Sequence, residues 1–267
     1  MSTPARRLLL FDNLLDSDAR AFINAALLSS PTQKTAINNL VKDLKNAGLW
    51  SKFYAIYPIV GGTAAAHSFN LKNSALYPIV WSNSPTHSAN GVDFNGTQFG
   101  RTGLVPSAVL TANNTALHYY SREDTAAASI SEIGARNNAA TAFLAVFLKA
   151  ALAPDGIISQ QYDNNTAQGR LNAANSNSSG MFTFSRTASN AHAAYRNGTS
   201  LGSQTTSGGS LPAFELYIGA RNNEGVAELF TNRQCAFAAV SSGLTAAEAQ
   251  TMYQIVQSFQ TYLGRAV

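Results

Sequence analysis

The six residues Ile133-Gly134-Ala135-Arg136-Asn137-Asn138 return unchanged as Ile218-Gly219-Ala220-Arg221-Asn222-Asn223. Within each copy, apolar residues alternate with other residues at the two-residue period of a β-strand. The paired asparagines favour a turn, because their side chains bond to the nearby backbone. Two copies so far apart do not make a solenoid repeat. We therefore predict that each copy ends a strand, and that the copies form equivalent edges of one β-sandwich.

Short β-branched and aromatic runs, separated by clusters of Gly, Asn and Ser, extend this pattern from Phe53 to Val240. Such spacing is typical of an all-β sandwich. The predicted strands are 53–60, 75–81, 116–121, 129–135, 141–149, 156–162, 180–185, 191–196, 214–220 and 234–240. The pairs Asn95-Gly96 and Asn197-Gly198 each predict a tight hairpin. Polar stretches at 172–180 and 199–209 predict long surface loops.

Helices are predicted only at the two ends of the chain. Ser30-Pro31-Thr32-Gln33 combines a hydroxyl cap, a proline in the first turn and a glutamine three residues after the cap, which together start a helix. A shorter helix at 17–28 precedes it, so we expect a helical hairpin. Thr245 and Glu248 form a second capping box, which predicts a C-terminal helix packed on the outside of the sandwich.

The chain is weakly charged, since only 12% of its 267 residues are Asp, Glu, Lys or Arg. Its surface must therefore consist largely of uncharged polar groups, which suit repeated contacts with protein neighbours or with sugars. The 18 Lys and Arg residues exceed the 14 Asp and Glu residues slightly and are scattered. Because nucleic-acid sites gather basic residues on one face, we expect no nucleic-acid partner.

Membrane association is not expected, because no apolar run approaches the length that spans a bilayer. The apolar run at 8–11 is too short for a signal peptide. We predict that residues 1–15 form an arm that docks on neighbouring subunits, followed by one domain at 16–267. Cys235 lies in an alternating apolar stretch and is expected to be a buried thiol, so the chain is interpreted as a soluble protein from a reducing compartment.

Several landmarks resemble one known family when they are taken together. They are the segment Ala36 to Trp50, Tyr57-Pro58, Gly61-Gly62-Thr63-Ala64, Tyr195-Arg196-Asn197-Gly198 and Leu263-Gly264-Arg265. In this combination the chain resembles the concanavalin A-like, laminin-G-like domains of tailed-bacteriophage structural proteins, over residues 15 to 265. The resemblance implies a two-sheet jelly roll carried on a virion. It brings no catalytic residues with it.

The function expected from this resemblance is structural. The protein would be a non-enzymatic virion component of a tail, fibre or capsid surface, assembled in the bacterial host cytoplasm. Its partners would be other virion proteins and copies of itself. Attachment to host-surface polysaccharide is a further hypothesis, because uncharged polar surfaces suit sugars.

Catalysis is the main alternative. Most glycoside hydrolases need two carboxylates across the sugar, and in a strand such a pair usually lies two or four residues apart. No acid pair in an apolar run has that spacing. We therefore predict that the protein is not an enzyme, although acids distant in sequence can converge in a fold. The alternative is a polysaccharide-degrading glycoside hydrolase, that is, a depolymerase.

Neither a metal nor a cofactor is expected. The four histidines, His67, His87, His118 and His192, are dispersed, with no two at ligand spacing. Asp163-Asn164-Asn165 offers oxygens that suit calcium, but a turn rich in Asx residues has the same sequence, and we favour the turn.

Sugar recognition requires an aromatic ring flanked by amides and hydroxyls. Trp81 with Asn83, His87 and Asn90 approaches this combination best and is the candidate glycan-binding site. The competing interpretation, which we favour, is that Trp81 caps the core at the end of its strand.

Overall fold

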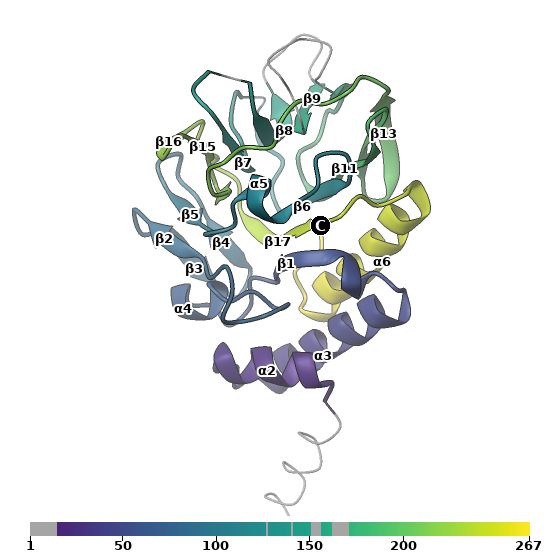
Figure 1. Ribbon diagram of the computed structural model, residues 1–267. Helices are drawn as coiled ribbons and strands as arrows, with labels where there is room; N and C mark the ends of the chain where they lie inside the picture. Colours follow the sequence, from purple (N-terminus) through teal and green to yellow (C-terminus); the bar gives the residue numbers. More distant parts are fainter. Residues whose placement is uncertain (1–14, 127, 140, 151–155, 162–170) are drawn as a thin grey trace, which may run out of the picture.

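Two β-sheets lie face to face, and three helices cover the outer face of one of them (Figure 1). The computed structural model describes residues 15–126, 128–139, 141–150, 156–161 and 171–267. The predicted β-sandwich with a few flanking helices is confirmed in this part of the chain. The predicted arm at 1–15 lies outside these residues except for Leu15, which is buried in the core.

The first sheet, which we call sheet A, includes the longest strand of the described residues, β11 (Gly180–Ala188). β6 (Thr115–Ser121) and β17 (Cys235–Ser241) are its central pair, with antiparallel partners on both sides, and β1 (Phe53–Tyr57) pairs with β17. In spatial order the strands are β13 (Thr199–Gln204), β12 (Ala191–Arg196), β11 (Gly180–Ala188), β6 (Thr115–Ser121), β17 (Cys235–Ser241), β4 (Gly91–Asp93) and β3 (Thr86–Ser88), with β1 (Phe53–Tyr57) beside the main path.

The second sheet, sheet B, carries the groove described below. In spatial order its strands are β10 (Leu171–Ala174), β9 (Gly156–Gln161), β8 (Phe143–Ala150), β7 (Ile133–Arg136), β14 (Tyr217–Ile218), β5 (Phe99–Arg101) and β2 (Val80–Ser82). A small hairpin of β15 (Arg221–Asn223) and β16 (Val226–Glu228) joins the sheet through β7. β2 lies at the end of this strand order.

The helices begin where their caps predict. Ser30 Oγ accepts a hydrogen bond from the backbone N–H of Gln33, and Thr245 and Glu248 form the predicted capping box. The N-terminal hairpin and the C-terminal helix are therefore confirmed. The helices are α2 (Ser17–Ala25), α3 (Pro31–Asn46), α4 (Ala64–His67), α5 (Pro106–Val109) and α6 (Ala246–Tyr262), with a 3₁₀ turn at Trp50–Lys52.

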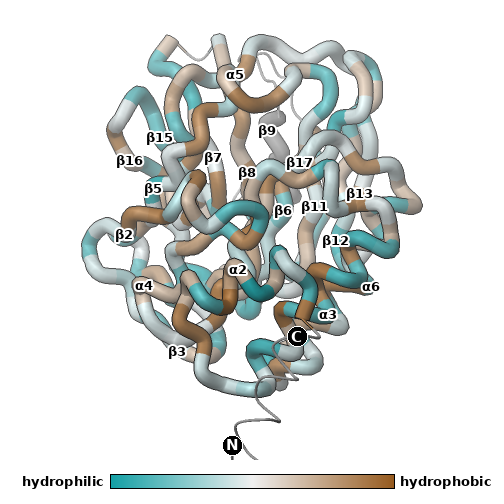
Figure 2. Tube along the Cα trace, turned by 60° about the horizontal axis from the view of Figure 1, so that its bottom comes forward, coloured by the Kyte–Doolittle hydropathy of each residue, from teal (hydrophilic) through white to brown (hydrophobic). Residues whose placement is uncertain are grey.

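Sheet A has apolar side chains on both faces, because it is the middle layer. On β17, Ala238 and Val240 contribute to the core between the sheets, whereas Phe237 and Ala239 belong to the core under the helices. The helical layer presents one apolar stripe to this second core, as expected of amphipathic helices. Figure 2 shows hydrophobic and hydrophilic residues alternating along α3 and α6.

The two copies of the repeated hexapeptide lie side by side in sheet B. The first copy forms β7, an interior strand between β8 and β14. The second copy is broken at Gly219, whose φ of +89° reverses the chain, so Ile218 pairs antiparallel with Ile133 and Arg221 pairs parallel with Gly134. The prediction of two equivalent sheet edges is therefore wrong, because the left-handed glycine divides the second copy between β14 and β15.

The predicted hairpin at Asn95-Gly96 and the loops predicted at 172–180 and 199–209 also differ from the structure. Asn197-Gly198 does join β12 and β13 as a hairpin, but Asn95-Gly96 connects β4 of sheet A to β5 of sheet B. The hairpin near that position is β3–β4, in which Ser88 pairs with Gly91. The stretches expected as loops at 172–180 and 199–209 also contribute the strands β10 and β13.

Candidate functional site

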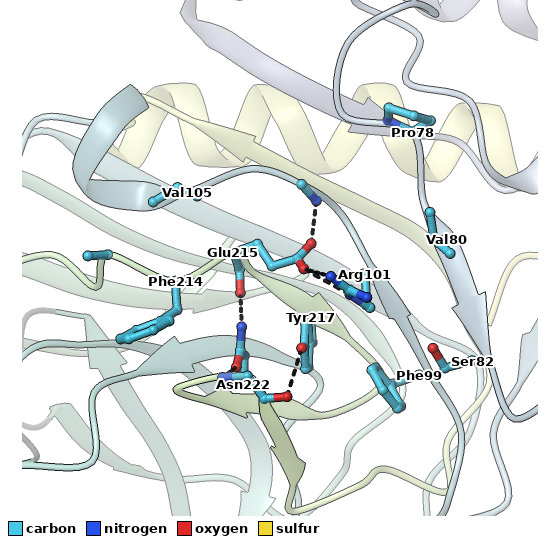
Figure 3. A pocket seen from close by; sticks show the side chains of 13 residues that line it. Pro78, Val80, Ser82, Phe99, Arg101, Val105, Phe214, Glu215, Tyr217 and Asn222 are labelled. Carbon is cyan, nitrogen blue, oxygen red and sulfur yellow. Dashed lines mark hydrogen bonds and ion pairs between the residues drawn. The ribbon is translucent and has the colours of Figure 1, made fainter.

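An open groove of about 790 Å³ lies on the outer face of sheet B, over β2, β5 and β14. Aromatic, aliphatic and charged side chains from segments distant in sequence meet in it (Figure 3). Its principal lining residues are Val80, Ser82, Phe99, Arg101, Glu215 and Tyr217. Pockets for small ligands typically enclose about 300–1,000 Å³, so the groove is of sufficient size.

The period of the strands determines which side chains face the groove. Val80 and Ser82 lie two residues apart on β2 and both line it. Phe99 and Arg101 do the same on β5. Gly100, between them, faces the opposite side, where a Cβ atom would lie only 2.8 Å from the indole ring of Trp81. Alternation along two paired strands thus builds one wall of the groove.

The aromatic part of the groove is preorganised by ring packing. Phe99 and Tyr217 have their ring centroids 4.8 Å apart at an interplanar angle of 34°, and Phe230 meets Phe99 edge-on. The Tyr217 hydroxyl donates a hydrogen bond to the carbonyl of Gly225. Because these contacts hold the rings in place, they offer a rigid apolar surface to a ligand.

An ion pair lies beside the aromatic rings. Glu215 Oε1 accepts from Arg101 Nε at 2.9 Å and lies 2.8 Å from Nη2, while Oε2 accepts from the backbone N–H of Gly103 at 2.7 Å. Hydrogen bonding to Glu215 raises the pKa of Arg101. Both carboxylate oxygens are therefore engaged, whereas the Arg101 side chain is 53% exposed and faces the groove.

Asn222 connects the repeated hexapeptide to the groove. Its Nδ2 donates to the backbone carbonyl of Glu215, and its Oδ1 accepts from the N–H of Gly225. These bonds fix the loop that follows β15 against Glu215, in the segment that leads into β14. Among the described residues lining the groove, Glu215 is the one carboxylate, so the groove itself supplies one of the two acids that most glycosidases use.

Trp81 and His87, from the site predicted by sequence, do come together. Their ring centroids are 4.9 Å apart, and the Trp81 indole N–H donates to the carbonyl of Ala64. The half-buried Trp81 ring also packs near Phe94 and against the core between the sheets. Trp81 therefore lies on the side of β2 opposite the groove.

The two asparagines of the predicted site lie in loops and bond to neighbouring segments of the chain. Asn83 Nδ2 donates to the carbonyl of Thr97, and Asn83 has a left-handed φ of +61°. The backbone N–H of Asn90 bonds to Ser88 Oγ in the β3–β4 turn. Both side chains are exposed, and binding of a glycan by the four residues stays a prediction.

Buried His67 pairs with half-buried His87 beside Trp81. His67 Nε2 accepts from the N–H of Gly62, so a neutral His67 carries its proton on Nδ1 and donates it to Nδ1 of His87, 2.9 Å away. Burial, the like charge of His87 and the nearby Arg265 lower the pKa of His67 to about 3. Burial also lowers the pKa of His87. The pair is thus neutral and joins α4 to β3.

Metal ligands are dispersed in the described part of the chain, which contains no group of three His, Cys, Asp or Glu side chains able to hold an ion. The calcium candidate at 163–165 lies outside these residues. Cys235 is buried, and desolvation raises the pKa of its thiol to about 12. No helix in the described ranges has the length and apolar character needed to cross a bilayer.

No protein-family model matches the chain, and no curated protein is similar to it in sequence. Solved structures resemble it in fold. Domain 4 of AbnA, a GH43 extracellular arabinanase from Geobacillus stearothermophilus, in complex with arabinotriose, is 12% identical with a TM-score of 0.46, over 76% of this chain and 98% of that domain.

Two further structures represent other proteins in this group. Trypanosoma rangeli sialidase is 14% identical with a TM-score of 0.48, over 82% of this chain and 39% of the sialidase. Botulinum neurotoxin type C, whose cell entry depends on interaction with two ganglioside molecules, is 7% identical with a TM-score of 0.57, over 79% of this chain and 53% of the toxin chain. The chain thus spans about half or less of these two proteins, and such low identity shows the fold alone.

The prediction that the protein is not an enzyme is corrected by these comparisons. An arabinanase domain and several sialidase structures occur among the structures of similar fold. A non-enzymatic role therefore does not follow from the fold of the chain. The sequence argument tested only acids that are close together in sequence, and a fold also brings together side chains from distant segments, as Arg101 and Glu215 show.

Proposed function

We propose that the protein binds carbohydrate chains in the groove over β2, β5 and β14. The observation that carries this proposal is the Phe99–Tyr217 ring pair beside the Arg101–Glu215 ion pair. Sugars present apolar C–H faces that stack on aromatic rings, and hydroxyls that bond to polar groups at the edges of those rings. The groove offers both types of contact within one surface (Figure 3).

The openness of the groove to solvent suits a polymer. Val80, at its margin, is 60% exposed, and Arg101 is half exposed. A chain of sugars can therefore lie across β2 and β5 without either sheet having to open. The toxin of similar fold interacts with gangliosides, so glycan recognition is compatible with this architecture.

The biological setting is a second part of the proposal. The resemblance to concanavalin A-like domains of tailed-phage structural proteins supports a jelly-roll connectivity and a place on a virion, among copies of this chain and other virion proteins. In that setting the glycan would be a host-surface polysaccharide. The proposed place on a virion rests on the sequence resemblance over residues 15 to 265.

A polysaccharide-degrading glycoside hydrolase is the second candidate function. Glu215 favours it, because this carboxylate lies in the groove next to the aromatic rings. Catalysis by the usual two-acid mechanism would need a second carboxyl group from beyond the described lining. Release of reducing ends from the bound polysaccharide is the measurement that identifies this activity.

The groove is tested by the substitution Phe99→Ala in a glycan-binding assay. Phe69→Ala is the matched control, because Phe69 is also a half-buried phenylalanine but packs in the core under the helices. Losing a stacking ring should weaken glycan binding about tenfold, since such a contact contributes roughly 1–1.5 kcal/mol. Phe69→Ala should leave the affinity unchanged. Equal affinities for the wild type and Phe99→Ala would refute the groove as the binding site.

A further inference from the structure

The charges in the groove cancel within the groove itself. Arg101 and Glu215 are the two charged residues of its described lining, and they bind each other. One oxygen of the Glu215 carboxylate accepts from the Arg101 guanidinium, and the other accepts from the N–H of Gly103. The chain as a whole has a formal net charge of +4, so this local neutrality is a property of the site.

The charges on the surface next to the groove are also paired within the chain. On the outer face of sheet B, Glu228 lies 2.7 Å from Arg221 Nη2 and 3.8 Å from Arg136 Nε. Both arginines also stack on Phe143. Both arginines therefore have partners within the chain, although they share one carboxylate.

Glu215 is placed to oppose an anionic ligand. A sugar carboxylate that approached the exposed edge of Arg101 would come close to Glu215 Oε1, which is 2.8 Å from Arg101 Nη2. The Glu215 side chain is only 17% exposed, so water screens its charge less than that of a surface residue. A sugar hydroxyl, in contrast, can accept a hydrogen bond from Arg101 without this repulsion.

We infer that the groove selects neutral over anionic glycans and that Glu215 is the residue that sets this selectivity, an inference that rests on the proposed function. Arg101 then acts as a hydrogen-bond donor to hydroxyls, oriented by Glu215. The aliphatic and aromatic surfaces of Val80, Phe99 and Tyr217 receive the apolar faces of the sugar. Selectivity arises here from a repulsive group as well as from attractive contacts.

The first test uses the wild-type chain. Its affinities for neutral polysaccharides, barley β-glucan and arabinan, are compared with those for polygalacturonate and alginate, which carry a carboxylate on each sugar. Neutral glycans should bind at least about tenfold more tightly, and their affinity should change by less than about twofold between 50 and 500 mM salt, because no net charge is neutralised on binding.

The second test uses Glu215→Gln, with Asp43→Asn as the matched control. Asp43 is exposed on α3, so its substitution removes the same charge in the helical layer. At low salt, Glu215→Gln should raise the affinity for polygalacturonate on the order of tenfold, since one close repulsive charge is removed. This gain should become smaller at high salt but persist in part, because Glu215 is mostly buried. Asp43→Asn should behave like the wild type.

The outcomes separate the inference from the proposed function. If the wild type binds polygalacturonate as tightly as the neutral glycans, or if folded Glu215→Gln gains nothing, the inference fails while glycan binding stands. If no polysaccharide of either kind binds, the proposed function fails and the inference with it. Should Glu215→Gln not fold, which thermal unfolding reveals, the wild-type comparison of neutral and anionic glycans decides alone.

Discussion

Arg136 and Arg221, the arginines of the two hexapeptide copies, hold their guanidinium groups over the same phenylalanine ring. They lie 5.2 and 5.0 Å from the centroid of Phe143, and both approach Glu228. Together they cover a small apolar cluster on the outer face of β8 that includes Phe147. The repeat therefore supplies the cover of sheet B beside the groove.

Arg221→Ala should destabilise the protein more than Arg136→Ala. The Arg221 side chain is the more buried, at 9% exposed against 20%, and lies closer to Glu228. We expect a loss of about 2 kcal/mol for Arg221→Ala and less than about 1 kcal/mol for Arg136→Ala, because a desolvated cation–π contact is worth more than an exposed one. Urea denaturation measures both. Equal losses would contradict the unequal burial.

Gly219→Ala should be more damaging than Gly225→Ala, although both glycines have φ near +90°. A Cβ atom at Gly219 would lie 2.5 Å from the Phe94 ring, whereas nothing lies within 4 Å of one at Gly225. We expect losses of about 3 and about 1 kcal/mol, since only the first combines backbone strain with overpacking. The free energy of unfolding of each variant decides. A ranking in the opposite order would contradict the packing of Gly219 on Phe94.

Trp81→Ala should lower stability rather than groove affinity. The ring packs on His87, Phe94 and Gly100, and its N–H bonds to Ala64. Truncating this half-buried side chain should cost about 2 kcal/mol. Glycan affinity, measured at a temperature where the variant is fully folded, should match that of the wild type. Loss of affinity in the folded variant would instead favour the Trp81, Asn83, His87 and Asn90 site.

Stability should fall as the pH is lowered from about 6.5, the usual histidine pKa. Burial lowers the pKa of His118 to about 3, so only the unfolded chain takes up this proton between pH 6.5 and 3. The native state binds fewer protons there, and the free energy of unfolding therefore decreases with decreasing pH. His67 and His192, with pKa values of about 3, act in the same direction.

The variant His118→Gln measures how much the protonation of His118 contributes to this pH dependence of stability. Between pH 5 and 6, where carboxyl groups are mostly ionised in both states, its unfolding free energy should depend on pH less steeply by up to about 1.4 kcal/mol per unit. Glutamine retains groups that can bond to Thr183 and Ser241, the partners of His118. Parallel pH profiles for the wild type and the variant would show that His118 is not neutral in the native state.

Local signals in the sequence predict the elements well where the structure depends on neighbours along the chain. The caps at Ser30 and Thr245 start α3 and α6, and Asn197-Gly198 forms its hairpin. Asn95-Gly96 has the same dipeptide, yet it links two different sheets, because strand pairing is decided by contacts distant in sequence. Local turn chemistry does not encode which strands pair.

The groove was missed for the same reason. Phe99 and Arg101 have the spacing of two side chains on one strand face, but Glu215 and Tyr217 come from more than a hundred residues further along the chain. Only the pairing of β14 with β5 brings them together. Trp81 was the candidate glycan-binding residue because of its residue type. Its neighbours Val80 and Ser82 are the β2 residues that face the groove, because side chains alternate along the strand.

Methyl NMR of the chain, titrated with barley β-glucan oligosaccharides and arabinan oligosaccharides, tests carbohydrate binding in the groove. Val80 and Val105 line the groove, whereas Leu27 and Val267 are exposed away from its lining and serve as references. We predict that the Val80 and Val105 methyl signals shift with saturation while those of the references do not. Shifts confined to other methyl groups, or no shifts with any glycan tested, would contradict carbohydrate binding in the groove.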